Sequence, residues 1–201
     1  WLLLVAFIPT GVVGLVVKKS GMIDFMLTPS NAIWIVPIML VIGGIFMLFC
    51  DKLFNKGTEQ DEVTEKKAFW IGVIQCLSMI PGTSRSMSTI VGGMSQKLTR
   101  RSAAEFSFFL AVPTMAAATG LDVLELFVGS DAVGTGWATS ENLIMLLIGC
   151  VVAFIVALLA MKWFVSFLSK YGFKSFGWYR IAIGAFILIW MLTGHSMVMF
   201  E

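Results

Sequence analysis

The sequence predicts an all-α, polytopic membrane protein, and three observations lead to this fold class. Of the 201 residues, 58% are hydrophobic and only 13% are charged. The mean hydropathy is +0.92, which is high for a soluble domain. The charged residues gather in short segments between apolar stretches, many of them close to the roughly 20 residues that a helix needs to cross a bilayer. We therefore expect one integral membrane domain over residues 1–201. The net charge of +2 gives no indication of a nucleic-acid partner.

About five stretches are apolar enough to be transmembrane helices. They cover residues 1–17, 33–50, 103–120, 142–161 and 178–193. The segment 51–67 is polar and mixed in charge, so it is predicted to be a solvated loop. The glycine-containing segment 121–141 is predicted to be a flexible external connection.

Residues 68–98 have a different pattern. The apolar part, residues 69–80, has about 12 residues, too few to cross a bilayer. Pro81 and Gly82 interrupt it, and a second short, weakly apolar segment follows. Irregular backbone at membrane depth is tolerated where it is buried in protein or lines a cavity. We therefore predict a re-entrant helical hairpin over residues 68–98, with Arg85 near its tip.

The distribution of charge supports this hairpin. If residues 68–98 enter and leave on one side, that side carries eleven basic residues: Lys52, Lys56, Lys66, Lys67, Lys97, Arg100, Arg101, Lys162, Lys170, Lys174 and Arg180. The other side carries only Lys18 and Lys19, together with an acidic loop. Because cytoplasmic loops are enriched in Lys and Arg, the hairpin is predicted to enter from the cytoplasmic side.

The break in the hairpin is a candidate anion site. An arginine at membrane depth costs about 2.5–3.5 kcal/mol on insertion scales, so its presence indicates a task. Amides at a helix N-terminus attract anions, and a guanidinium can bind two phosphate oxygens at once. The predicted site comprises Gln75, Gly82, Thr83, Ser84, Arg85, Ser86 and Thr89. In the alternative interpretation, this is a capped turn whose arginine reaches the surface or pairs with a carboxylate, and Gln75 is a satisfied interhelical residue.

Two further titratable residues are weaker candidates. Glu105 is the carboxylate within an apolar stretch, but Ser102 three residues earlier completes a capping-box pattern, which favours a helix cap. His195 is the sole histidine and is expected at the membrane interface rather than as a general base.

The hairpin segment resembles a known family. Residues 69–91, FWIGVIQCLSMIPGTSRSMSTIV, are similar to the second conserved region of the undecaprenyl-diphosphate phosphatases, also called bacitracin-resistance proteins. Residues 8–15 and 102–123 resemble flanking parts of that family. The resemblance implies an inverted repeat with two re-entrant hairpins in a bacterial inner membrane. It also implies hydrolysis of undecaprenyl diphosphate to undecaprenyl phosphate. This reaction recycles the carrier lipid for cell-wall synthesis and confers bacitracin resistance.

The resemblance also assigns roles. Arg85 would bind and neutralise the diphosphate, assisted by Ser84 and Thr89, and activity would need a divalent cation, Mg²⁺ or Ca²⁺. No metal ligand is expected in this chain, because the family's glutamates belong to a first conserved region that would precede Trp1. We therefore expect a C-terminal portion of a longer chain, inactive alone. Met87 stands where the family usually has glycine. The implied partners are a polyprenyl diphosphate lipid, the bilayer and a second copy in a homodimer.

One other class of protein fits the same pattern. Discontinuous helices that carry charge near the midplane also bind substrates in secondary transporters. A transporter or flippase of a polyprenyl phosphate or another anion is therefore the alternative.

Overall fold

The computed structural model describes residues 1–54, 57–58, 62–128 and 139–193, and its regular elements are helices. In chain order they are α1 (Leu2–Lys19), α2 (Met22–Leu27), α3 (Pro29–Phe54), α4 (Glu65–Gln75), the 3₁₀ helix η1 (Cys76–Met79), α5 (Arg85–Ser95), α6 (Arg100–Val128), α7 (Ser140–Tyr171) and α8 (Lys174–Leu192). Five of them, α1, α3, α6, α7 and α8, are long and apolar enough to cross a membrane. The predicted all-α polytopic fold is confirmed.

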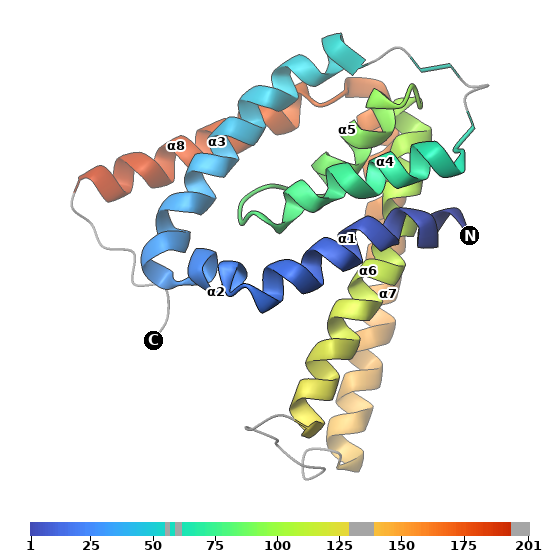
Figure 1. Ribbon diagram of the computed structural model, residues 1–201, viewed down its shortest axis with the longest axis vertical. Coiled ribbons are helices and arrows are strands. Elements are labelled where there is room, and N and C mark those ends of the chain that lie inside the picture. The colour runs from blue at the N-terminus through green and yellow to red at the C-terminus, as the bar shows by residue number, and fades with distance from the viewer. Residues whose placement is uncertain (55–56, 59–61, 129–138, 194–201) are drawn as a thin grey trace.

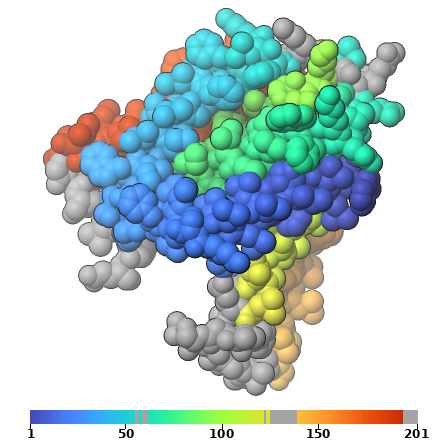
Figure 2. Space-filling model, viewed as in Figure 1, coloured from blue at the N-terminus to red at the C-terminus, as the bar shows by residue number. Residues whose placement is uncertain are grey.

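The helices form a packed body from which one pair of helices projects. Figure 1 shows α3 beside α8, and α1 beside the hairpin of α4 and α5. The distal parts of α6 and α7 extend away from this body as an arm, which Figure 2 shows below α1. The most apolar window of α7 has no residue buried by the described part of the chain.

Close helix contacts in the body depend on small residues. A Cβ on Gly44 would lie 2.8 Å from the carbonyl oxygen of Gly177, so α3 and α8 approach backbone to backbone. Gly72 of α4 faces Ala6 of α1 in the same way, and the hydroxyl of Thr10 donates to the Gly72 carbonyl at 3.0 Å. Small residues at such crossings are typical of membrane helix pairs, because they let the backbones come close.

Three connections meet at one end of the body. Asp51 near the end of α3 forms an ion pair with Arg100 at the start of α6, with 3.0 Å between Oδ1 and Nε. The other carboxylate oxygen of Asp51 accepts a hydrogen bond from the Phe173 amide at 2.9 Å, between α7 and α8. The segments that the charge pattern assigned to one side therefore lie together, and we refer to this region as the basic end.

Two helices are longer than the sequence pattern predicted. Helix α7 continues to Tyr171, ten residues beyond the predicted end, because aromatic side chains one turn apart stack along it, as Trp163 and Phe167 do at 5.3 Å. Gly172, with φ of 71°, then ends the helix. Helix α6 likewise continues through residues 121–128, where no glycine or proline interrupts it after Gly120. The rest of the predicted acidic connection, residues 129–138, lies outside the described residues.

The close contact at Gly72 allows us to predict how a substitution there changes the stability of the fold. In Gly72→Ala the new methyl group would overlap the Ala6 carbonyl oxygen, so α1 and α4 must separate. We expect a loss of about 1–3 kcal/mol, measured as a lower denaturation midpoint in detergent. Gly149→Ala is the matched control, because Gly149 is also helical and has nothing within 4 Å of its Cβ position. An equal loss in both variants would contradict the packing role of Gly72.

Candidate anion-binding site at the tip of the hairpin

The predicted hairpin is present as two short antiparallel helices. Helices α4 and η1 together extend about 24 Å, less than the roughly 30 Å of a hydrocarbon core. The chain turns at Pro81 and Gly82, and α5 returns beside α4 (Figure 1). Entry and exit of this hairpin on one side of a membrane stays a prediction, and the geometry is compatible with it.

The turn at the tip needs glycine. Gly82 has φ of +87°, a conformation that other residues rarely adopt. A Cβ there would also lie 2.6 Å from the carbonyl oxygen of Val36 in α3. The tip therefore lies directly against the backbone of α3, and this contact fixes its position within the helical body.

Ser84 begins the second half of the hairpin. Its backbone is extended, and its Oγ accepts a hydrogen bond from the Met87 amide at 3.3 Å, so it is the N-cap of α5. The Ser86 hydroxyl lies 3.1 Å from the same Oγ. In the part of the chain that the structure describes, no recorded hydrogen bond uses the amides of Arg85 and Ser86. These two N–H groups at a helix N-terminus can bind an anion.

Arg85 is the first residue of α5 and is partly buried. Its Nη1 is buried without a hydrogen-bond partner among the described residues. The Thr83 hydroxyl and the Gln75 side-chain oxygen are also buried without a hydrogen-bond partner among the described residues. Gln75 is 1% exposed. Burial without partners costs about 1–3 kcal/mol per polar group, and more for a charged one. An anion at the tip would satisfy Arg85, so the geometry favours the predicted anion site over an arginine that pairs with a carboxylate of the described chain.

Thr89 lies one turn beyond Arg85 and is buried. Its Oγ1 is within hydrogen-bond distance of the Arg85 and Ser86 carbonyl oxygens, at 3.0 and 3.2 Å, and of the Ser107 hydroxyl of α6. Thr89 thus joins the first turn of α5 to α6. Ser107 is also buried, and it belongs to no motif in the sequence that marks it as a site residue.

Arg180 of α8 is the main residue that sequence reasoning missed. Its Nη2 donates to the Gly82 carbonyl oxygen at 2.6 Å and lies 3.5 Å from the Met39 carbonyl oxygen. The charge count had placed Arg180 with the basic loops, whereas the structure directs it inward to the tip. The sequence does contain an indication of this role. Arg180 lies within the predicted span 178–193, where a charged side chain is costly.

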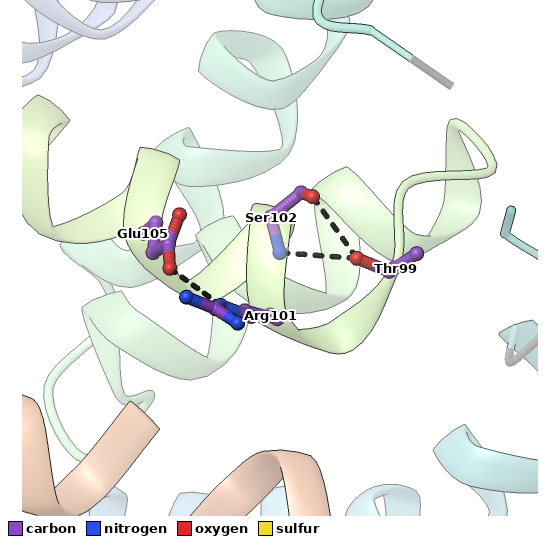
Figure 3. Close-up of polar contacts among 4 residues, drawn as sticks. All are labelled: Thr99, Arg101, Ser102 and Glu105. Carbon is purple, nitrogen blue, oxygen red and sulfur yellow. Dashed lines mark hydrogen bonds and ion pairs between the residues drawn. The ribbon is translucent and has the colours of Figure 1, made fainter. Parts of the chain in front are cut away.

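The predicted cap at Ser102 is wrong by one turn. Helix α6 begins at Arg100, and the Oγ1 of Thr99 accepts a hydrogen bond from the Ser102 amide at 3.1 Å, as Figure 3 shows. Thr99 is therefore the capping residue, because it is the last hydroxyl residue before the helix. Glu105 instead pairs with Arg101, with 2.9 Å between Oε1 and Nε (Figure 3). Glu105 is on the outer surface, away from the tip. His195 lies outside the described residues.

The tip offers donors for an anion rather than ligands for a metal. Residues 75–89 include no Asp, Glu or His. The described residues contain no group of three or more His, Cys, Asp or Glu that could hold a metal ion. Magnesium and calcium prefer several carboxylate and carbonyl oxygens, so a guanidinium, amides and hydroxyls with the single side-chain carbonyl of Gln75 do not make a site for either ion. The guanidinium, amides and hydroxyls do fit the oxygens of a phosphate.

The fold and the tip define a class: a polytopic membrane protein with a polar, arginine-containing hairpin inside its helical body. The profile of the bacitracin resistance protein BacA family matches residues 1–186, and the chain belongs to that family.

Several curated relatives cover nearly all of this chain. A Porphyromonas gingivalis protein is 49% identical over 98% of this chain and 67% of its own length. A Flavobacterium psychrophilum protein is 50% identical over 93% of this chain and 67% of its own length. A Bdellovibrio bacteriovorus protein is 41% identical over 98% of this chain and 72% of its own length. Each is named undecaprenyl-diphosphatase. The chain thus spans about two thirds of the length of these relatives.

Proposed function

We propose that this protein is an undecaprenyl-diphosphatase, which hydrolyses undecaprenyl diphosphate to undecaprenyl phosphate and inorganic phosphate. The observation that carries the proposal is Arg85: a charged side chain with a buried, unpartnered Nη1 at a helix N-terminus, on a hairpin inside a protein of the BacA family. Family membership and the names of the relatives do not favour a transporter.

The tip residues act on the charge of the diphosphate. Water adds to the terminal phosphorus, the bond to the bridging oxygen breaks, and the lipid monophosphate leaves. Arg85 and the first amides of α5 hold the phosphoryl oxygens and stabilise the charge that develops on them, which is the main protein contribution in phosphoryl transfer. Ser84 and Thr89 keep the first turn of α5 in place through their hydrogen bonds. The attacking water is not assigned to a base at the tip, since residues 75–89 include no Asp, Glu or His.

An apolar groove next to the tip suits the prenyl tail. Its volume is about 330 Å³, and it lies between α3 and the hairpin. Met39, Ile42 and Ile80 are among its apolar lining residues, and Thr83 and Ser88 are among its polar ones. A lipid with its diphosphate at Arg85 would place the first isoprene units in this groove.

The proposal includes a cellular setting and a cation. The protein is a multi-pass membrane protein, and we place it in the bacterial inner membrane, where it would return the carrier lipid to cell-wall synthesis and confer bacitracin resistance. A divalent cation, Mg²⁺ or Ca²⁺, is part of the proposal by family resemblance. The tip does not hold it, so its ligands would come from residues beyond the tip. A homodimer is also proposed on that basis.

Two substitutions of Ser84 can distinguish its capping of α5 from anion binding at the same helix N-terminus. Ser84→Ala removes the cap and is expected to cost about 1 kcal/mol of stability. Ser84→Asp keeps a capping oxygen and so retains stability, but its charge repels the diphosphate and raises KM strongly. The measurements are the denaturation midpoint and the KM for undecaprenyl diphosphate. A stable Ser84→Asp variant with an unchanged KM would contradict anion binding at this cap.

The experiment that tests the function is phosphate release. The product of the complete gene, purified in detergent, is incubated with undecaprenyl diphosphate and Mg²⁺, with and without excess EDTA. We expect one phosphate released per lipid, loss of release with EDTA, and no further release from undecaprenyl monophosphate. Binding of the diphosphate without any release by folded protein would reject the hydrolase and support a carrier for this lipid.

A further inference from the structure

A second lipid-facing groove lies between α6 and α7 at the basic end, separate from the hairpin. Its volume is about 1000 Å³, and none of its lining residues belongs to the hairpin. It lies between α6 and α7, which run side by side (Figure 1). The proposed hydrolysis does not use this groove.

The groove has a charged half and an apolar half. Arg101, Lys162 and Lys170 line it together with one carboxylate, Glu105, so these four residues leave a net charge of +2. Figure 3 shows Arg101 and Glu105 in contact on the first turns of α6. Among the described residues, Lys162 and Lys170 have no recorded ion pair, and Lys170 lies over the Tyr171 ring at 5.2 Å. This half is therefore electropositive.

The apolar half lies towards the distal end of the two helices. Phe109 of α6 and Leu159 of α7 line it, and their exposed fractions are 64% and 66%. The helices are antiparallel and Phe108 packs on Phe164 at 5.7 Å. Arg101 therefore lies towards the Lys170 end of α7, whereas Lys162 lies level with Phe109, where the charged and apolar parts of the groove meet. From Arg101 to Phe109 the helix rises about 12 Å, which is the scale of a headgroup with the beginning of its acyl chains.

The position of Lys162 along α7 is the one expected for a residue at the membrane interface. The stretch before Lys162 is uninterrupted by charge from Asn142 to Met161, long enough to span the hydrocarbon core. Trp163 follows Lys162 and is 64% exposed, as expected for an aromatic residue in the headgroup layer. Lys162 thus lies at the edge of the hydrocarbon core, one turn from Leu159. Lys170 lies about 12 Å farther out along the helix, so the two lysines bracket the headgroup layer.

We propose that this groove is a binding site for an anionic phospholipid, with the phosphate between Lys162 and Lys170, within reach of both side chains, and the acyl chains on Phe109 and Leu159. Basic pockets between transmembrane helices on the cytoplasmic side recognise such headgroups. The paired charge and apolar surface distinguish this ligand from free phosphate, which would use the charged half alone. Glu105 opposes the ligand's charge and sets the strength of the site.

Native mass spectrometry tests the proposal on the complete gene product released from a neutral detergent. The probes are phosphatidylglycerol and phosphatidylcholine with identical chains. We expect tighter binding of phosphatidylglycerol, a loss of about fivefold for each of Lys162→Gln and Lys170→Gln, and little change for phosphatidylcholine. Glu105→Gln is expected to strengthen phosphatidylglycerol binding, a gain that misfolding cannot imitate. Leu159→Ser should weaken both lipids.

The matched control is the double variant Lys66→Gln with Lys174→Gln, two exposed lysines on the first turns of α4 and α8, outside the groove. It should keep the phosphatidylglycerol preference. An equal loss in the control, or wild-type protein without any preference, would overturn the proposal. Displacement of phosphatidylglycerol by equimolar inorganic phosphate would overturn the lipid assignment. These readouts are binding measurements and do not depend on phosphate release.

Discussion

Replacing Arg85 by alanine is expected to lower phosphate release by about 10³-fold or more, the range found when an arginine that stabilises a phosphoryl-transfer transition state is removed. The fold should survive, because Nη1 of Arg85 has no hydrogen-bond partner among the described residues and its removal leaves no protein group unpaired there. Arg85→Lys keeps the charge but loses the two-pronged geometry, so it should recover only a small part of the rate. The measurements are kcat, KM and the denaturation midpoint of each variant.

The control for Arg85 is Lys174→Ala, which removes a basic residue from the exposed first position of α8. Its rate should match that of the unmodified protein. Near-normal turnover in both Arg85 variants would remove this arginine from the site. A large drop in denaturation midpoint for Arg85→Ala would instead indicate a structural role.

Arg180→Met is expected to have the second-largest effect, through the position of the tip. The variant removes the donor to the Gly82 carbonyl oxygen, a charged hydrogen bond of 2.6 Å. Such a bond contributes about 1.5–3 kcal/mol, so the denaturation midpoint should fall. Since the tip is displaced from α3 and α8, kcat should fall about 10²-fold, the cost of a shift of about 1 Å in a reacting group.

Arg180→Lys and a double variant distinguish positioning from direct phosphate binding. Lysine can still donate to the Gly82 carbonyl and should restore the midpoint and most of kcat, whereas at Arg85 it should not. In the double variant Arg85→Ala with Arg180→Met, the loss of rate should be smaller than the product of the two single losses, because a displaced tip without its arginine has little left to lose. Fully multiplicative losses would show that Arg180 acts independently of the tip.

The membrane fold and the hairpin could be predicted because both depend on local sequence. Apolar stretches of sufficient length mark α1, α3, α6, α7 and α8, and the 12-residue run before Pro81 is too short to join them. Ser84 was predicted as a site residue that assists Arg85, and its role as the N-cap of α5 emerged from the structure. Arg85 was identified from local sequence, as a charge beside a helix break.

The rest of the site depends on contacts between distant segments. Arg180 is 98 residues from Gly82, and a charge near the predicted end of a span is equally consistent with a loop residue. Ser107 reaches Thr89 only because α5 and α6 pack together. The cap of α6 was misplaced because Thr99 and Ser102 are both good capping residues, and the exact start of the helix decided between them.

The bond between Arg180 and Gly82 has a consequence for biogenesis. A ribosome delivers the hairpin long before α8, and chains fold from the N-terminus as they emerge. While α6 and α7 are being inserted, the Gly82 carbonyl therefore lacks its charged partner, and the hairpin is held by its contacts with the earlier helices α1 and α3. The anion site acquires its final shape only when α8 enters and packs along α3. Premature stop codons before residue 180 should thus yield inserted chains whose hairpin never matures.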